Sequence, residues 1–269
     1  MAGVASVRGG RRISTSQIFN GAVGVIVVAA LIVQSVLNVR TGTVLVPTRF
    51  VRMFSSFTVQ SNVLVAVAAF GLALAPARDS RPWRVLRLDA LVGISVTGVV
   101  YTTVLQTQQQ LHGWAVVTDA VFHYVVPLAA VAGWLAFGPR PRFDARIVWW
   151  SLAWPVAWLG YTLVHGYVTG WYPYPFIDVA RHGYGIVALN ALAVTAVFAV
   201  MAAVFWLGDA YLPGGRPRRP AGSLPARPLA FGFAAAPAIA DEHVEQPSDH
   251  ADDDGAPEGG PEPGDVERE

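Results

Sequence analysis

The chain has 269 residues, of which 54% are hydrophobic and only 14% are charged. Soluble domains carry about 25% charged residues, so this composition indicates an integral membrane protein. Cysteine is absent, which excludes a disulfide framework and any thiolate metal site. All 19 basic residues other than histidine are arginines, and 18 of them precede residue 241, whereas 12 of the 18 acidic residues follow residue 240. The apolar part is therefore positively charged, which suits anionic lipid headgroups. The arginines are dispersed between apolar segments, so nucleic acid is not an expected partner.

Six apolar runs each approach the roughly 20 residues that a helix needs to cross a bilayer. The breaks between these runs are rich in Arg, Pro and Gly. No small-x-small cleavage site follows the first run, so we expect it to stay uncleaved as the first span. The sequence thus predicts an all-α, polytopic integral membrane protein with six transmembrane helices. The runs are Ile18–Leu37, Phe54–Ala75, Leu88–Leu105, Ala120–Phe137, Ile147–Val164 and Tyr184–Leu207.

The distribution of arginine predicts the orientation. Fourteen arginines lie in the N-terminal segment, in the second and fourth loops and after the sixth span, whereas four lie on the opposite side. Positive charge concentrates on the cytoplasmic side of membrane proteins, so we expect a multi-pass protein of the cell membrane with both termini in the cytoplasm.

Three regions follow from this topology: a cytoplasmic segment at residues 1–17, a six-helix domain at 18–210 and a tail at 211–269. The tail is rich in Pro, Gly, Ala and Arg and then becomes acidic. Such a composition buries too little apolar surface to offset its ordering entropy, so we predict disorder. Its change of charge sign leaves two alternatives to a simple solvated tail, namely loose self-association and headgroup contact.

A polar face interrupts the second apolar run. Thr58, Ser61, Asn62 and Val65 have the spacing i, i+3, i+4 and i+7, which places them on one face of a helix. Lipid penalises an unpaired polar group, so this face is expected to point into protein or water. Other spans carry polar residues at the same expected depth, in the outer leaflet, which predicts one polar cavity there. The further candidates for substrate binding in this cavity are Tyr101, Tyr124, Tyr161 and Asn190.

The fourth run carries Asp119 and His123 at i, i+4 spacing. Ionisable groups inside a span suggest function, and Asp119 is placed to orient the His123 ring and raise its basicity. A threonine hydroxyl near that ring would complete an arrangement of nucleophile, base and orienting residue. Asn62 or a backbone N–H at the start of the second span would then stabilise an oxyanion.

A purely structural interpretation competes with this one. Threonines in membrane helices often bond back to their own i−4 carbonyl, and buried histidines often serve as hydrogen-bonding partners between helices. A metal site is a weaker alternative because no H-x-x-H or H-E-x-x-H spacing exists, so we predict no metal and no cofactor.

The fifth loop, residues 170–178, combines aromatic rings with two prolines. Its Trp and Tyr residues suit the membrane interface, where such rings anchor. The prolines would make the segment stiff, so a lid or re-entrant corner over the cavity is the alternative to simple anchoring. Interface anchoring does not explain Asp178.

Three motifs in this order on six spans resemble a known family. They are Phe57-Thr58-x-x-Ser61-Asn62, His123-Tyr124-x-x-Pro127 and Tyr172-Pro173-Tyr174-Pro175-Phe176. The resemblance covers roughly residues 15–210. It is to bacterial six-transmembrane proteins related to the androgen-induced-protein family, whose animal members resemble threonine hydrolases of fatty-acid esters of hydroxy fatty acids. It implies Thr58 as nucleophile and His123 as its histidine partner, whereas the role of Asp119 is inferred from its spacing alone.

The leading functional hypothesis is a lipid-ester hydrolase that uses Thr58, His123 and Asp119, with membrane lipids and a fatty-acyl ester as partners. A rival hypothesis is a non-enzymatic protein that binds or moves a small hydrophobic ligand through the same cavity. A structural subunit of a larger membrane complex is a third. The sequence predicts no particular protein partner.

Overall fold

The computed structural model describes residues 12–40, 44–108 and 110–213, and every regular element in these ranges is helical. Six helical segments are long and apolar enough to cross a membrane, which confirms the all-α class and the six predicted spans. The predicted disordered tail lies outside the described residues from residue 214, as do residues 1–11 of the N-terminal segment. The six segments are Thr15–Arg40, Phe57–Leu74, Arg81–Leu105, Trp114–Phe137, Ala145–Thr169 and Val179–Tyr211.

Several spans consist of more than one helical piece. The α-helices are α1 (Thr15–Arg40), α2 (Val46–Ser55), α3 (Phe57–Leu74), α4 (Arg81–Val100), α5 (Trp114–Ala120), α6 (Val126–Phe137), α7 (Ala145–Ser151), α8 (Ala153–Thr169) and α9 (Val179–Tyr211). The shorter elements are the π-helical turns η1 (Tyr101–Leu105) and η3 (Val121–Val125) and the 3₁₀ turns η2 (Gln106–Gln108) and η4 (Pro175–Ile177).

The second span differs from its predicted course because the chain breaks at Ser56. Helix α2 ends at Ser55, and Ser56 adopts an extended conformation with φ −70° and ψ 137°. Its hydroxyl then accepts the Val59 N–H at 3.3 Å, which caps the start of α3. The apolar run beginning at Phe54 therefore covers the end of one helix and the start of another, and Thr58 lies in the first turn of α3.

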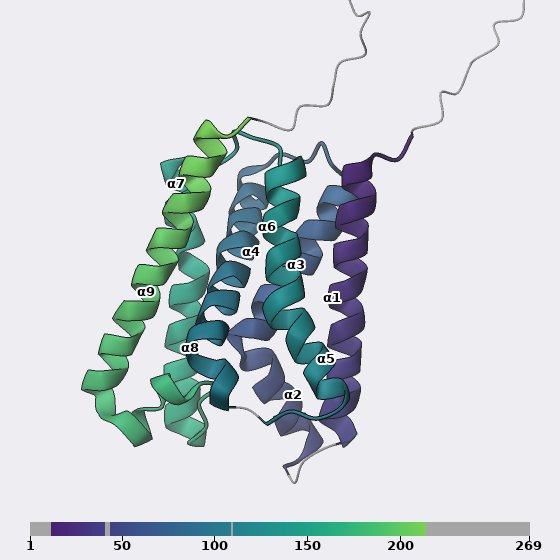
Figure 1. Cartoon of the computed structure of the whole chain (residues 1–269). Helices are drawn as coiled ribbons and strands as arrows, with labels where there is room; N and C mark the ends of the chain where they lie inside the picture. Colours follow the sequence, from purple (N-terminus) through teal and green to yellow (C-terminus); the bar gives the residue numbers. More distant parts are fainter. Residues whose placement is uncertain (1–11, 41–43, 109, 214–269) are drawn as a thin grey trace, which may run out of the picture. The chain divides into compact units, whose positions relative to one another are not determined.

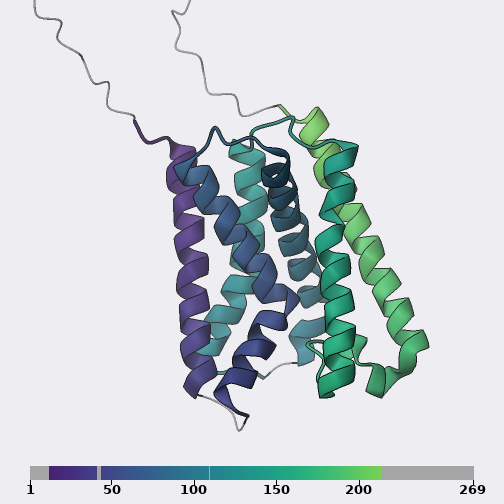
Figure 2. The ribbon, with the colours of Figure 1, turned by 180° about the vertical axis from the view of Figure 1, so that it is seen from behind.

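Helix α4 lies between the other helices, and α1 and α9 stand at opposite edges of the bundle (Figures 1 and 2). Helix α4 contacts α3, α6, α7 and α9. In an 18-residue apolar window of the third span, which contains α4, 67% of the residues are buried. The corresponding share for α9 is 17%. Helix α4 is thus the central element, and α9 leaves most of its surface for lipid.

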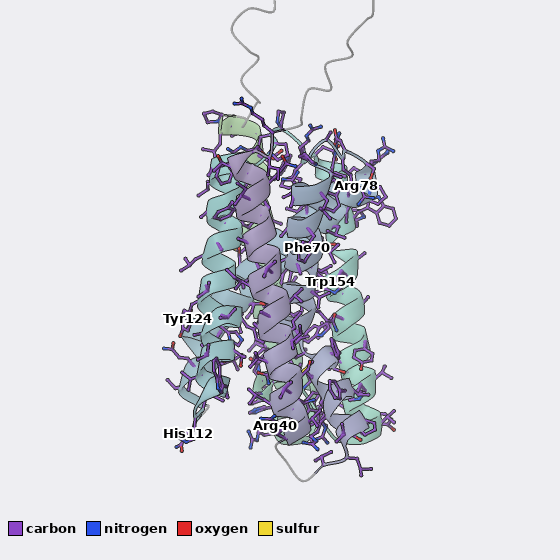
Figure 3. All side chains as sticks on the ribbon, turned by 90° about the vertical axis from the view of Figure 1, so that its right-hand side faces the viewer. Arg40, Phe70, Arg78, His112, Tyr124 and Trp154 are labelled. Carbon is purple, nitrogen blue, oxygen red and sulfur yellow. The ribbon has the colours of Figure 1, made fainter. Side chains whose placement is uncertain are left out.

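Successive spans alternate in direction, so the first turn of α1 and the last turn of α9 lie at the same end of the bundle (Figure 1). Arg78 lies toward this end, whereas Arg40 and His112 lie at the other (Figure 3). The arginine-rich second loop is therefore at the end where the described chain begins and finishes.

Helices α3 and α4 approach closely where Gly71 faces the Trp83 ring. A Cβ atom at Gly71 would lie 2.1 Å from the indole, whereas one at Gly160 in α8 would meet nothing within 4 Å. Gly71→Val should therefore destabilise the protein by about 1–3 kcal/mol through overpacking. Thermal unfolding in detergent checks this, with Gly160→Val as the control that carries the same helix-propensity cost. Equal unfolding temperatures for the two variants would contradict the close packing of α3 on α4.

Candidate active site

Thr58 owes its position to the helix break at Ser56. The first N–H groups of a helix have no intrahelical acceptor, and Thr58 lies in that first turn. Its N–H donates to the Tyr174 hydroxyl oxygen at 3.1 Å. A residue 116 positions further along the chain therefore completes the start of α3.

The two polar faces predicted from the sequence meet. Thr58 Oγ1 lies 3.3 Å from His123 Nε2, so a hydrogen bond joins the first turn of α3 to the π-helical turn η3. His123 is buried, with 9% of its surface exposed. This distance is slightly longer than the roughly 2.6–3.2 Å of a productive contact between a hydroxyl and a general base, as is common in structures without substrate.

The other nitrogen of the His123 ring faces acceptors only. Nδ1 lies 3.0 Å from Asp119 Oδ1 and 3.0 Å from the Asp119 backbone oxygen. In the neutral ring we therefore assign the hydrogen to Nδ1, which leaves the Nε2 lone pair directed at Thr58. Tyr101 donates its hydroxyl hydrogen to Asp119 Oδ2 and stacks on the His123 ring at 3.8 Å between centroids. Asp119 and Tyr101 thus fix both the tautomer and the tilt of the ring.

Tyr174 is a site residue that the sequence analysis had only placed in the fifth loop. Its hydroxyl lies 3.2 Å from Thr58 Oγ1 in addition to accepting the Thr58 N–H. Burial raises the pKa of the Tyr174 hydroxyl, and the hydrogen bonds from Thr58 only partly oppose that rise, so the group stays protonated. The Tyr174 hydroxyl can therefore donate a hydrogen bond to Thr58 Oγ1.

Asn190 in α9 supports this loop, because its side-chain amide donates to the Phe176 carbonyl at 2.7 Å. Its contact is with the backbone of the loop rather than with Thr58. The sequence of this loop indicated a stiff segment, because Tyr and Pro alternate in it. It did not indicate that the segment reaches the start of α3.

Asn62 and Ser61 lie inside the bundle. Both are 0% exposed. The Asn62 amide donates to the carbonyl of Thr58 at 2.9 Å and to that of Phe122 at 3.4 Å. Asn62 therefore holds α3 against the segment that carries His123, and its N–H groups are not free to bind an oxyanion. Ser61 Oγ faces Gly93 of α4 and has no hydrogen-bond partner among the described residues.

The two other tyrosines predicted for substrate binding, Tyr124 and Tyr161, lie near the site but hydrogen-bond to other residues. Tyr124 contacts the Tyr101 ring edge-on at 5.6 Å between centroids and donates to the Gln106 side chain at 2.9 Å. The Tyr161 hydroxyl lies 2.6 Å from the Ser55 hydroxyl, at the end of α2. Among the described residues, neither tyrosine side chain forms a hydrogen bond with Thr58 or His123.

Two cavities meet at Thr58. A polar cavity of about 380 Å³ is lined by Asp119 and His123 and by two arginines, Arg49 and Arg52. A narrow apolar crevice of about 70 Å³ extends instead between α4, α8 and α9. Thr58, Tyr174 and Leu105 line both spaces. Thr58 therefore lies between the polar cavity and the apolar crevice.

Together these observations define the chain as a multi-pass integral membrane protein in which a half-buried Thr58, beside two cavities, contacts a buried His123. Comparison with protein-family models, with curated proteins and with solved structures gives no match. Among the described residues, no group of three or more His, Cys, Asp or Glu side chains could hold a metal ion.

The position of Asn62 generates a stability prediction. Asn62→Leu removes the two hydrogen bonds that the amide donates to the Thr58 and Phe122 carbonyls, and a hydrogen bond contributes about 0.5–1.5 kcal/mol. We therefore expect a lower unfolding temperature in detergent. Thr103→Val is the control, because the exposed Thr103 hydroxyl bonds only to its own helix at the Val99 carbonyl. A loss no larger than that of Thr103→Val would contradict the bridging role of Asn62.

Proposed function

We propose that this membrane protein is a lipid-ester hydrolase in which Thr58 is the nucleophile and His123 the general base. The observation that carries this proposal is the 3.3 Å contact between Thr58 Oγ1 and a His123 ring whose opposite nitrogen faces only acceptors. A base held in this orientation next to a hydroxyl is the arrangement by which enzymes activate an otherwise weak nucleophile.

In the first half-reaction, Nε2 of His123 takes the Thr58 hydroxyl proton while Oγ1 attacks the ester carbonyl. The negative charge on the carbonyl oxygen is stabilised by the Tyr174 hydroxyl, which turns from Thr58 toward that oxygen. The tetrahedral intermediate then collapses and the bond to the alcohol oxygen breaks. His123 returns its proton to the leaving alcohol, and the acyl group remains on Thr58.

In the second half-reaction, water enters from the polar cavity and loses a proton to His123 as it attacks the acyl-threonine. The ester bond to Thr58 breaks, the protonated His123 restores the Thr58 hydroxyl and the carboxylic acid leaves. Asp119 does not touch the substrate in this scheme. It acts as a positioning residue that stabilises the imidazolium formed in each half.

The two cavities support a substrate with one apolar and one polar part. We assign the start of an acyl chain to the apolar crevice, from which it would continue along the lipid-exposed faces of α8 and α9. The alcohol portion would lie in the polar cavity near Arg49 and Arg52. Fatty-acid esters of hydroxy fatty acids, the class that the sequence resemblance implies, have this division, and we propose them as the first substrates to test.

Turnover of such an ester by purified protein tests the proposal. Thr58→Ala and His123→Ala should each lower kcat by at least about 10³-fold, whereas Thr58→Ser, which keeps a hydroxyl, should retain part of the activity. Thr103→Ala is the matched control and should leave turnover unchanged, because its exposed hydroxyl bonds to the Val99 carbonyl and Thr103 lines neither cavity at Thr58. Esters that stabilise wild type and Thr58→Ala equally, with no product from either, would contradict hydrolysis and support the rival ligand-binding function.

We further propose that both termini face the cytoplasm and that the Thr58 site opens to the opposite side of the cell membrane. The natural chain contains no cysteine, so single cysteines can report accessibility without a modified background. In intact cells a membrane-impermeant maleimide should label Val44→Cys and His112→Cys, whereas Ser14→Cys and Ala77→Cys should react only after permeabilisation. The reverse pattern would contradict this orientation.

A further inference from the structure

A third cavity lies at the other end of the bundle and shares no lining residue with either cavity at Thr58. Its volume is about 520 Å³, within the range of about 300–1,000 Å³ that is typical of ligand sites. Helices α1, α3, α4 and α6 enclose it, together with the loops that follow α3 and α6. Much of its wall is made of small residues, which are Ala68, Ala69, Ala77, Ala90, Ala129, Ala130, Gly133 and Ala136.

Arg87 and Arg142 are the charged residues of this wall, and Arg87 is the buried one; its guanidinium lies over the Phe143 ring at 6.0 Å. Arg87 is 5% exposed, yet within residues 12–40, 44–108 and 110–213 its guanidinium makes no hydrogen bond. The Asp209 carboxylate attracts it without coming within ion-pair distance. Asp209 Oδ2 instead accepts the backbone N–H groups of Arg142 and Phe143. Asp209 therefore offsets part of the charge of Arg87 but supplies no acceptor to its N–H donors.

Trp134, another residue of this wall, carries a second donor without an acceptor. The indole nitrogen of Trp134 is buried and has no hydrogen-bond partner in the described chain. A buried donor without an acceptor is costly, and a guanidinium presents five N–H groups in a geometry that fits carboxylate and phosphate oxygens. The Arg87 guanidinium carries donors alone, so whatever fills the cavity beside it has to offer an acceptor.

From these observations we infer that this cavity binds an anionic amphiphile, with its carboxylate or phosphate on Arg87 and its acyl chain between the small residues of α3, α4 and α6. The bilayer offers two sources of this chemistry, a free fatty acid and an anionic phospholipid. Arg87 lies six residues after the start of α4, about 9 Å along the helix, so a headgroup can reach it from the interface at that end. The site is separate from the proposed hydrolytic site and does not depend on it.

Thermal unfolding of the full-length, delipidated protein in a neutral detergent tests the inference. Oleate or dioleoyl phosphatidate at saturating concentration should raise the unfolding temperature of wild type by about 5 °C. The neutral counterparts, oleyl alcohol and dioleoyl phosphatidylcholine, should raise it by much less. The anion that gives the larger shift identifies the source of the headgroup.

Matched variants locate the effect. Arg87→Gln should lose the shift, whereas Arg81→Gln, which removes an exposed charge from the first turn of the same helix, should keep it. Thr58→Ala should also keep it, which separates this site from the proposed active site. If Arg87→Gln does not fold, Ala129→Phe tests the same point, because it fills the cavity and leaves Arg87 in place.

Three results would overturn the inference. The first is a wild-type protein that responds equally to the anionic and neutral lipids. The second is a folded Arg87→Gln or Ala129→Phe variant that responds as strongly as wild type. The third is a full shift with inorganic phosphate alone, which would mean that the cavity takes an anion but no acyl chain.

Discussion

The candidate active site depends on one continuous chain of hydrogen bonds that joins the start of α3, the fifth loop and the α5–η3 segment in the interior of a membrane protein. In such surroundings each unpaired polar group costs several kcal/mol, so the direction of every donor matters. Thr58 N–H donates to Tyr174, the Tyr174 hydroxyl can donate to Thr58 Oγ1, and Thr58 can donate to His123 Nε2. The His123 Nδ1–H then donates to Asp119. This assignment pairs every member of the chain, and it leaves the Thr58 proton directed at the base.

Irregular helix geometry makes this network possible. The break at Ser56 opens the start of α3, and the π-helical turns at Tyr101–Leu105 and Val121–Val125 carry Tyr101 and His123. Irregularities of this kind are frequent at functional sites because they turn side chains away from the regular helical positions. In a membrane they also leave backbone groups that need partners, which the side chains of Tyr174 and Asn62 supply.

Features of the fold and site that depend on residues close in the sequence could be predicted, whereas contacts between distant residues could not. The six spans follow from hydrophobic length, and the pairing of Asp119 with His123 follows from helical spacing, because both depend on residues close in the sequence. The break at Ser56 was missed because Ser55 and Ser56 were included in one run starting at Phe54, and no Gly or Pro marks the break. Tyr174 was missed because its contact with Thr58 joins residues 116 positions apart, which periodicity does not report. Asn62 was placed on the correct face, but its donors go to two backbone carbonyls and not to the cavity.

Covalent labelling of Thr58 tests the central claim most directly. An alkyl fluorophosphonate loses fluoride when an activated hydroxyl attacks its phosphorus, and the adduct stays on the attacking oxygen. Peptide mass spectrometry of the treated full-length protein should find this adduct on Thr58 in wild type, none at that position in Thr58→Ala, and far less on Thr58 in His123→Ala. Wild-type Thr58 that stays unmodified, or that reacts equally well without His123, would contradict the account.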